Sequence, residues 1–466
     1  MGNLKIKELD SIGYVDNRLK SIVINTIAKH FKHHTNEDII SILIHIRDNP
    51  DTYVNDAIKS KIALAFISEK HDLPANEYQL MQTLTPIKIY GADEIEDAAK
   101  QQMALALSLP ISIQGALMPD AHSGYGLPIG GVLATRNAVI PYGVGMDIGC
   151  RMTLTIIDAD EKFLNRYDHQ IKKVLFSDTH FGMEGGLAVA QYHEVLDDSR
   201  FKATPLLKKL HGKAIKQLGT SGSGNHFVEF GMIKLADNNT LGLPGNSYMA
   251  LLSHSGSRGL GANIARHYTQ VAMDTCKLPR QAQPLAWLNL DTEAGQEYWL
   301  SMNLAGDYAR ACHDRIHANL LKTLGLKALH KTENHHNFAW REKLADGAEA
   351  IIHRKGATPA HEGELGIIPG SMATPAYLVA GKGNTDSLNS ASHGAGRAMS
   401  RQEAKASMTG SALKKTLAAA GVTLIGGSME ENPSAYKNIE AVMAAQTNLV
   451  SIQGKFMPRI VRMNNE

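Results

Sequence analysis

Apolar residues recur at helical spacing over the first part of the chain. Thr35 and Asp38 have the spacing of a capping box, and an apolar run over residues 39–44 follows them directly. A second segment with apolar periodicity runs over residues 54–67. The pattern predicts a small helical segment over residues 1–80 that carries little chemistry.

Short apolar runs with glycine-rich connections replace this helical pattern farther along the chain. Residues 87–90 have the pattern of a strand, and residues 93–109 that of a helix that ends before Pro110. Short β-like runs follow at residues 131–135 and 138–141. Strands and helices therefore share one continuous stretch of chain.

Longer helices are expected in the second half of the chain, at about residues 260–275, 293–324, 411–420 and 435–450. No internal repeat, low-complexity linker or block of charge interrupts the sequence after the helical segment. This continuity favours the α+β class, with one large domain over residues 81–466 built around a buried central site, rather than separable modules.

The composition is that of an ordinary globular protein, with 43% hydrophobic and 20% charged residues among 466. The formal net charge is only +2, so a polyanionic partner would have to meet a local basic patch. The three cysteines are far apart, which argues against a disulfide framework and for a reducing compartment. The first residues lack the apolar core of a signal peptide, and no run reaches membrane-spanning length. We therefore expect a cytoplasmic protein with no membrane partner.

Five separated motifs place a metal-binding type of side chain among small residues. They are Gly145-Met-Asp147-Ile-Gly-Cys150, Gly224-Asn225-His226-Phe-Val-Glu229, Ser253-His254-Ser-Gly-Ser-Arg258, His335-His336-Asn337 and Ser392-His393-Gly-Ala-Gly-Arg397. Carboxylate, thiolate and imidazole groups hold borderline divalent cations, and small neighbours let the backbone approach a metal or a phosphate. Each motif alone has a plain structural explanation, but five in one chain predict a metal and phosphate site.

Asp147 and Cys150 are three residues apart between glycines. A thiolate at Cys150 can bridge two cations while the carboxylate holds one of them. For Cys276 and Cys312 a buried, inert role is the simpler interpretation. Adjacent histidines in a strand point to opposite faces, so only one of the pair at residues 335–336 should be a ligand.

His393 differs from the other histidines because it precedes a glycine-rich turn. Ser400 and Glu403 then have capping-box spacing, so His393 lies where a helix N-terminus would hold a phosphate. Neutral imidazole is a competent nucleophile toward phosphorus, although a role in orienting other ligands is also open. Upstream, Asp120 and His122 add a carboxylate and an imidazole that would orient the metal ligands.

The motif series resembles that of the RtcB family of GTP-dependent RNA-splicing ligases. The resemblance rests on Asp147-Ile-Gly-Cys150, Gly224-Asn-His226-Phe-Val-Glu229, His254-Ser-Gly-Ser-Arg258, His336-Asn337, Ile368-Pro-Gly-Ser-Met372 and His393-Gly-Ala-Gly-Arg397. The motifs occur in the family's order and cover roughly residue 118 to the C-terminus, whereas the helical segment matches poorly. The resemblance implies an α+β fold with mixed sheets around a buried dimetal site.

The resemblance also implies a cofactor set of two Mn²⁺ ions and GTP, with site residues carried over one by one. The metal ligands would be Asp147, Cys150, His226, His254 and His336, and the catalytic residue would be His393, which accepts GMP. The nucleotide-binding residues would be Asn225, His226, Phe227, Val228, Glu229, His336, Asn337, Pro369, Gly370, Ser371, Met372, His393, Gly394, Ala395 and Gly396. The reaction implied joins an RNA 3′-phosphate or 2′,3′-cyclic phosphate end to a 5′-hydroxyl end.

Two positions depart from the family's pattern. Met463 or a neighbour stands where the family has a lysine that reaches the guanylate, and Ala376 stands where a serine is usual. Guanine selectivity is therefore an open question. A metal-dependent phosphodiesterase or cyclic-phosphate hydrolase, and a non-catalytic RNA-binding paralogue, are the alternatives to the ligase.

The implied partner is RNA with broken ends, such as fragments of transfer or ribosomal RNA, and an accessory protein is possible in this family. Because the net charge is small, the RNA surface must be local. Its candidate residues are Arg258, Arg354, Lys355, Arg397 and Arg401.

Overall fold

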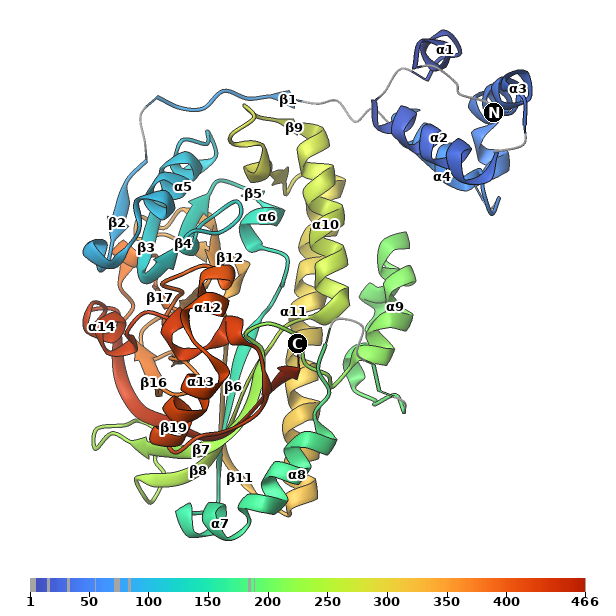
Figure 1. The fold of residues 1–466 in the computed structure, drawn as a ribbon. Helices are drawn as coiled ribbons and strands as arrows, with labels where there is room; N and C mark the ends of the chain where they lie inside the picture. The colour runs from blue at the N-terminus through green and yellow to red at the C-terminus, as the bar shows by residue number, and fades with distance from the viewer. Residues whose placement is uncertain are drawn as a thin grey trace. The chain divides into compact units, whose positions relative to one another are not determined.

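The chain folds into two compact units, Met1–Ala75 and Asn76–Glu466. The computed structural model describes residues 6–14, 17–31, 34–54, 56–70, 76–82, 85–182, 186–187 and 189–465 (Figure 1). The first unit has its own small apolar core, and the second contains all of the β-sheet structure of the described chain.

The first unit is helical. Its elements are α1 (Ile6–Ser11), α2 (Asn17–His30), α3 (Asn36–Asp48), the 3₁₀ turn η1 (Pro50–Tyr53) and α4 (Ser60–Lys70). Leu19, Leu43 and Ile62 lie in its core and are 1% exposed or less. The capping box is confirmed, since the Thr35 hydroxyl accepts from the backbone N–H of Asp38, and the carboxylate of Asp38 accepts from the N–H of Thr35.

An eight-stranded mixed sheet dominates the second unit. Its strands follow the order β11 (Ala328–His335), β6 (Arg151–Ile157), β8 (Ser247–Ser255), β7 (Phe227–Leu235), β19 (Val450–Asn465), β16 (Ala376–Gly381) and β15 (Leu365–Pro369), and β18 (Thr423–Gly427) pairs with β19. All of these pairs are antiparallel except β18 with β19.

This sheet curls until its two outer strands nearly meet. The side-chain amide of Asn334 in β11 donates to the carbonyl oxygen of Ile367 in β15 at 3.2 Å and accepts from the N–H of Ile367 at 2.9 Å. At this point a side chain bridges the two edge strands where no backbone pairing joins them. The result is a nearly closed sheet with an apolar interior that includes Met152, Leu252 and Phe456.

A second, five-stranded sheet packs in the same unit. Its order is β12 (Asn337–Lys343), β13 (Glu349–Lys355), β4 (Ile129–Thr135), β3 (Ser112–His122) and β2 (Ile87–Ile89). Three short two-stranded sheets pair β1 (Asn76–Glu77) with β9 (Cys276–Lys277), β5 (Ala138–Val139) with β10 (Leu288–Asn289), and β14 (Ala357–Pro359) with β17 (Ser390–Ser392).

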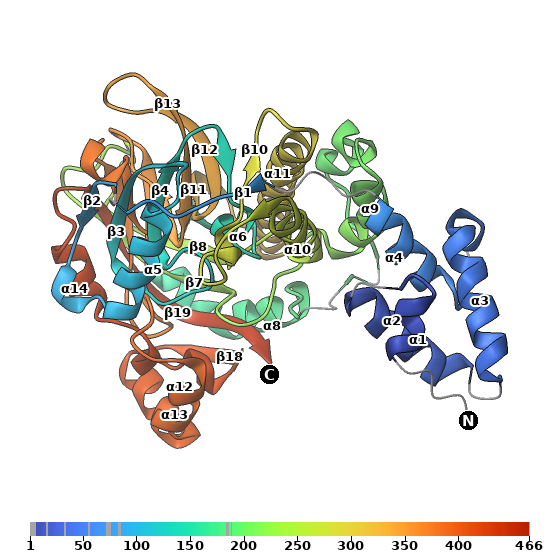
Figure 2. The same cartoon turned by 90° about the horizontal axis from the view of Figure 1, so that it is seen from above.

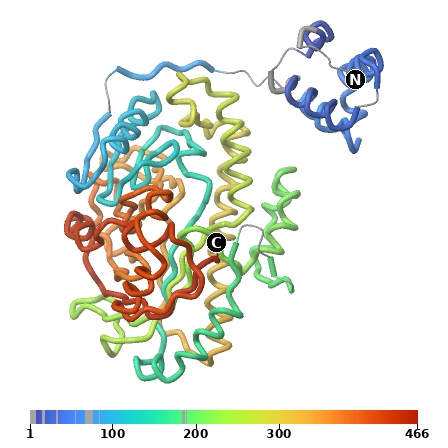
Figure 3. Tube along the Cα trace, viewed as in Figure 1, coloured from blue at the N-terminus to red at the C-terminus, as the bar shows by residue number. Residues whose placement is uncertain are grey.

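Helices cover the sheets. They are α5 (Asp97–Leu107), α6 (Pro141–Val144), α7 (Glu161–Arg166), α8 (Asp168–Asp178), α9 (Pro205–Gln217), α10 (Arg258–Thr275), α11 (Glu293–Leu324), α12 (Arg401–Ser407), α13 (Gly410–Ala419) and α14 (Ile439–Ala444). The long helices α10 and α11 run side by side and form the largest apolar cluster with α5 and α9 (Figures 1 and 2). The C-terminal strand β19 lies along β7, as the red and green segments of Figure 3 show.

The mixed α+β class expected from the sequence is confirmed. The long helix α11 has the bounds predicted for it, and the capping box of Ser400 and Glu403 begins α12. The helix expected over residues 435–450 is much shorter: it begins after the Asn438 cap and spans Ile439–Ala444, and Val450 already belongs to β19. None of the described helices combines the length and apolar character that crossing a membrane requires.

Candidate active site

Four neighbouring strands of the large sheet end together and bring four motifs to one place. Cys150 immediately precedes β6, His226 immediately precedes β7, His254 is the penultimate residue of β8, and His336 immediately follows β11. The antiparallel register aligns these ends, because His335 pairs with Arg151, His254 with Met152, and Phe227 with His254. Strand pairing thus collects side chains that lie far apart in the sequence.

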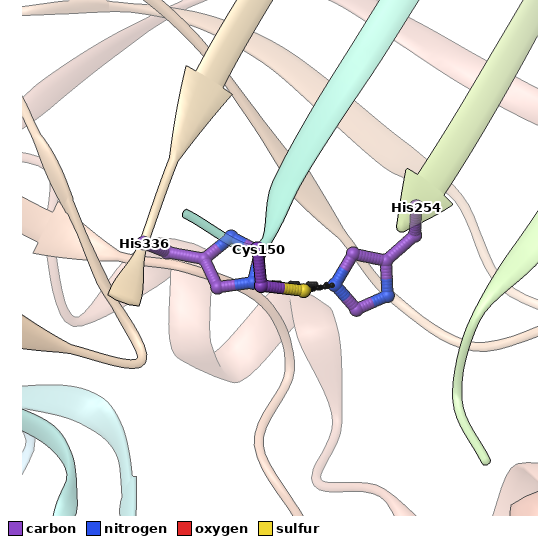
Figure 4. A group of neighbouring side chains, drawn as sticks. All are labelled: Cys150, His254 and His336. Atoms are coloured by element: carbon purple, nitrogen blue, oxygen red, sulfur yellow. Dashed lines mark hydrogen bonds between the residues drawn. The ribbon is translucent and has the colours of Figure 1, made fainter. Parts of the chain in front are cut away.

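The ligand atoms of these residues form two overlapping groups that share one sulfur. The Sγ atom of Cys150 lies 3.2 Å from Nε2 of His254 and 3.4 Å from Nε2 of His226. Nε2 of His336 lies 3.2 Å from Nε2 of His254, and an Asp147 carboxylate oxygen lies 3.0 Å from Nε2 of His226. Cys150, His254 and His336 form one group, and Asp147, Cys150 and His226 the other. Figure 4 shows Cys150 between His254 and His336.

Two glycines make room for these ligands. A Cβ atom at Gly256 would lie 2.0 Å from a carboxylate oxygen of Asp147, and one at Gly222 would lie 2.0 Å from Nδ1 of His226. Any larger residue at either position would displace a ligand. The small residues of the sequence motifs therefore serve close approach to the cluster.

Burial sets the protonation of the cluster. It lowers the pKa of His254 to about 3 and that of His336 well below its usual value, so both imidazoles are neutral and can offer a lone pair. Burial, followed by the charge of Asp147, raises the pKa of the Cys150 thiol. Burial is the largest single influence on Asp147 and works to raise its pKa, but the hydrogen bond and charge of His226, with smaller contributions from Cys150 and His254, together lower that pKa. The cluster thus offers two neutral imidazoles, a carboxylate and a thiol whose proton a cation would displace.

Backbone contacts orient the ligands. Nδ1 of His254 lies 3.1 Å from the carbonyl oxygen of Asn225, which directs Nε2 toward the cluster. Asn337 holds the loop that carries Asp147, since its carbonyl oxygen accepts from Gly149 N–H at 2.8 Å and its side-chain amide approaches the Asp147 carbonyl oxygen at 3.4 Å. Its side-chain oxygen accepts from Gly356 N–H at 2.9 Å. Asn337 therefore acts on the loop that carries Asp147 and does not line the cavity beside the cluster.

A cavity of about 170 Å³ opens beside the cluster. Thirteen of the residues that the resemblance implies line it: Asn225, Phe227, Glu229, His254, His336, Pro369, Gly370, Ser371, Met372, His393, Gly394, Ala395 and Gly396. Val228 does not, because strand alternation turns it to the opposite face of β7, where it is fully buried with Phe230 and Met249. Asp147, Cys150 and His226 belong to the cluster and not to the cavity wall.

His393 lies between the cavity and a buried carboxylate. Nδ1 of His393 is 2.6 Å from Oδ2 of Asp120, and the same oxygen accepts from the backbone N–H groups of His393 and Gly394. Asp120 is completely buried, so its hold on the imidazole is rigid. Because the carboxylate accepts the Nδ1 proton, a neutral His393 keeps its lone pair on Nε2. The ring centre of His393 lies 4.9 Å from that of His336.

Glu229 is the cavity's unpaired carboxyl group. It is 5% exposed, and within the described part of the chain it has neither a hydrogen bond nor an ion pair. Burial raises its pKa to about 8. A buried carboxyl group that has no partner in a cavity wall is suited to bind a polar group of a ligand.

Sequence reasoning missed part of the cavity wall. Tyr436 lines the cavity, and its hydroxyl donates to the buried carboxylate of Glu431, which also pairs with Arg397 at 3.0 Å. A lone tyrosine or glutamate among helix-forming residues carries no sequence signal. Asp120 was expected to orient metal ligands, whereas in the structure it holds His393.

One further sequence-based suggestion is corrected. Arg354 was a candidate RNA contact, but it is fully buried, pairs with Glu342 at 2.6 Å and stacks on Trp340. Arg462 does not reach the cavity, because it lies between the rings of Phe176 and Phe181. Both departures from the family's pattern, Ala376 and Met463, do line the cavity.

Comparison with known proteins settles the relationship. The family model described as "tRNA-splicing ligase RtcB" matches residues 102–464, more than half of the chain. The chain belongs to the RtcB family. Relatives include RNA-splicing ligase RtcB1 of Escherichia coli, 30% identical over 411 aligned residues that cover 80% of this chain and 97% of that protein. The tRNA-splicing ligase RtcB of Nanoarchaeum equitans is 30% identical, covering 80% and 94%, and the RNA-splicing ligase RtcB of Mycobacterium tuberculosis is 31% identical, covering 73% and 94%.

The RtcB match contains the whole candidate site and leaves the first unit out. Asp120 near its start and Met463 near its end both fall within residues 102–464, as do all the cluster ligands. The helical unit Met1–Ala75 lies outside the RtcB match.

Proposed function

We propose that this protein is an RNA ligase that uses GTP and two Mn²⁺ ions to join an RNA 3′-phosphate or 2′,3′-cyclic phosphate end to a 5′-hydroxyl end. The observation that carries the proposal is His393, whose Nδ1 is held by the buried carboxylate of Asp120 while its ring lies in the cavity wall beside the ligand cluster. Membership of the RtcB family supports the same reaction class.

The donor set fits the two cations. Cys150 with Asp147 and His226 would hold one ion, and Cys150 with His254 and His336 the other, which matches the two groups of ligand atoms. When bound, such ions neutralise phosphate charge and align attacking and leaving oxygens. The neutral imidazoles of His254 and His336 are already in the form that binds a cation.

His393 begins the reaction on GTP. The lone pair on Nε2 attacks the α-phosphorus, the P–N bond forms, and the bond from the α-phosphorus to the bridging oxygen breaks so that pyrophosphate leaves. Asp120 keeps the Nδ1 proton in place and stabilises the positive charge that develops on the ring. The glycines at residues 394 and 396 let the nucleotide's phosphate approach the backbone at this turn.

Two further transfers complete the joining of RNA. A 3′-phosphate oxygen attacks the phosphorus of the bound GMP, and the P–N bond to His393 breaks, which returns the lone pair to Nε2. The 5′-hydroxyl oxygen of the second strand then attacks the activated 3′-phosphate, loses its proton, and expels GMP. A 2′,3′-cyclic phosphate enters this sequence after hydrolysis to the 3′-phosphate. The substrates would be broken RNAs such as transfer or ribosomal RNA fragments.

Formation of the adduct tests the proposal. The protein is incubated with Mn²⁺ and α-labelled GTP, and acid-labile label on the protein is measured. His393→Ala should abolish the label while binding the same amount of metal. The matched control is His361→Ala, because His361 lies outside the cavity and the cluster. Label on His393→Ala equal to that on the unmodified protein would rule out His393 as the nucleophile.

The same assay separates the ligase from the two alternatives, and opening of a 2′,3′-cyclic phosphate separates the alternatives from each other. A metal-dependent phosphodiesterase would open 2′,3′-cyclic phosphates without forming any adduct. A non-catalytic RNA-binding paralogue would do neither and would still bind RNA. The position of His393 in the cavity wall favours the ligase, because neither alternative needs an oriented imidazole there.

A further inference from the structure

An exposed aromatic surface lies next to the candidate site and has no role in the reaction described above. It consists of Tyr125, Tyr142 and Met146, with Lys355 beneath them, and is called the mouth platform here. Tyr125 is 78% exposed and Met146 37% exposed. The rings of Tyr125 and Tyr142 lie 6.5 Å apart, and the Lys355 ammonium lies 5.3 Å from the ring centre of Tyr142.

Each segment of the mouth platform runs directly into the candidate site. The loop that carries Tyr125 follows His122, which lines the cavity, and Met146 immediately precedes the cluster ligand Asp147. Lys355 immediately precedes Gly356, whose N–H donates to the carbonyl oxygen of His336 at 2.7 Å. A Cβ atom at Gly356 would lie 3.2 Å from Cε1 of His393. In two of its segments the mouth platform is therefore one residue away in sequence from a cluster ligand, Asp147, or from a residue that contacts His336, Gly356.

The loop that presents Tyr125 is firmly held. The side-chain amide of Gln102 in α5 donates to the carbonyl oxygen of Gly124 at 2.6 Å and accepts from its N–H at 3.1 Å. The carboxylate of Glu96 accepts from the N–H of Ser123 at 2.5 Å. The exposed Tyr125 ring therefore belongs to a loop that hydrogen bonds hold in place, so the ring is available at a fixed position.

Lys355 adds a charge that no carboxylate balances. Its ammonium donates to the carbonyl oxygens of Tyr125 and Tyr142, and no carboxylate of the described chain lies within 4.0 Å of it. The residue is 9% exposed, and burial lowers its pKa to about 8. A buried, unpaired cation creates a positive potential at the adjoining surface, which favours an anionic ligand there.

We propose that the mouth platform binds the unpaired terminal nucleotide of an RNA strand, with its base stacked on Tyr125 and its phosphate drawn by the charge of Lys355. This inference rests on the proposed function, because it takes RNA as the substrate. An exposed ring beside a positive potential is the combination that binds single-stranded nucleic acid without reading its sequence. Bases within a duplex are already stacked, so the terminal nucleotide must be unpaired.

Stacking on the mouth platform would place a strand end where the chemistry needs it. From Tyr125 the chain leads back to His122 in the cavity wall, and from Met146 it leads on to the cluster. A strand stacked there would have its end directed toward the segments that carry the cavity wall and the cluster ligands. The platform would therefore contribute to RNA affinity and not to the attack of His393 on GTP.

The test uses two short RNA strands that carry 2-aminopurine, whose fluorescence falls on stacking. One has the probe as the last nucleotide before a 3′-phosphate, and the other as the first nucleotide after a 5′-hydroxyl. Tyr125→Ala should weaken binding of at least one strand by about 5- to 150-fold and remove its quenching. Tyr125→Phe should keep both, because the ring is retained. The strand that responds identifies the end that the platform holds.

Tyr192→Ala is the matched control, since Tyr192 is 66% exposed and lies outside the cavity, the cluster and the mouth platform. The inference is overturned if Tyr125→Ala binds and quenches both strands as the unmodified protein does, or if the unmodified protein quenches neither. Adduct formation from GTP should be unchanged in Tyr125→Ala. Absence of the adduct from the unmodified protein would instead refute the proposed function, so the two failures are distinguishable.

Discussion

At the scale of single residues, Cys150 is the position on which the ligand cluster depends. Its sulfur alone belongs to both groups of ligand atoms, whereas each histidine belongs to one. Cys150→Ser should therefore lower bound Mn²⁺ and abolish adduct formation, because a hydroxyl is a far poorer ligand than a thiolate. Metal analysis of the purified variant measures the first effect.

Cys276→Ser and Cys312→Ser provide the controls for this prediction. Both cysteines are buried away from the cluster and are free thiols. Their replacement should affect packing and leave the metal content unchanged. Full metal content and activity in Cys150→Ser would contradict the bridging role.

The raised pKa of Glu229 predicts that the stability of the fold depends on pH. Its pKa of about 8 in the folded chain is above the usual glutamate value of 4.5, so the folded state holds the proton more tightly than the unfolded state does. The free energy of unfolding should therefore fall as pH rises from about 4.5 to 8, by up to about 1.4 kcal/mol per pH unit, and then level off. Glu229→Gln lacks this ionisation, so it should match the unmodified protein near pH 4.5 and exceed its stability increasingly toward pH 8.

Urea unfolding at several pH values, without nucleotide, measures the difference between the two proteins. A constant difference across this range would show that Glu229 is ionised in the folded state. The same variant should bind nucleotide less well, since the Glu229 carboxyl group lines the cavity without an ion-pair partner in the described part of the chain. The substitution at Glu229 would then raise the stability of the fold and weaken the binding of nucleotide.

The candidate site residues could be picked out from the sequence, and the structure brings most of them together, but the side chains they contact could not be predicted. Aspartate, cysteine and histidine beside glycines are recognisable because few other patterns need those types together. The pairing of His393 with Asp120 joins residues 273 positions apart, and no local pattern reports it. The sequence also gives no sign that the Glu229 carboxyl group and the Lys355 ammonium lack an oppositely charged partner, because this depends on which side chains the fold places beside them.

At the scale of elements, strand register explains the cluster. The sequence predicted short strands but not that β11, β6, β8 and β7 are neighbours whose ends coincide. Long helices were easier to predict, since α10 and α11 have clear apolar periodicity. The order of strands in the large sheet depends on contacts between distant segments, for which one sequence holds no direct signal.

The side-chain alternation of the C-terminal strand β19 determines whether the methionine at position 463 can affect nucleotide binding. Alternation along the strand turns Val461 and Met463 toward the cavity and Arg462 away from it. Met463→Lys should therefore place a cation in the cavity wall and raise the preference for GTP over ATP in adduct formation by about ten- to a hundredfold, the range expected for one charge-assisted hydrogen bond. The measurement compares the rates of adduct formation with the two nucleotides.

Arg462→Lys serves as the control for the cavity-facing change, because this side chain lies between Phe176 and Phe181 and its replacement should leave the preference unchanged. Strict GTP selectivity in the unmodified protein, unaffected by Met463→Lys, would show that this end of β19 does not read the base.

At the scale of the whole molecule, the candidate site lies entirely in one of the two units. Every cluster ligand, the cavity wall and the mouth platform belong to Asn76–Glu466. The RtcB match begins at residue 102, and the first unit buries its own apolar residues in a separate core. We therefore interpret the helical unit as an addition to a complete catalytic fold.

This interpretation predicts that a chain of Asn76–Glu466 folds and forms the GMP adduct at the rate of the full protein. The cut leaves β1 paired with β9 and removes no residue of the large apolar clusters of the second unit. Adduct formation is measured with Mn²⁺ and α-labelled GTP on both chains, with His393→Ala in the shortened chain as the blank. Thermal unfolding confirms that the shortened chain is folded.

A folded Asn76–Glu466 that forms the adduct much more slowly would mean that the helical unit takes part in the nucleotide step. An unchanged adduct rate with weaker joining of RNA would instead assign the unit to the RNA substrate.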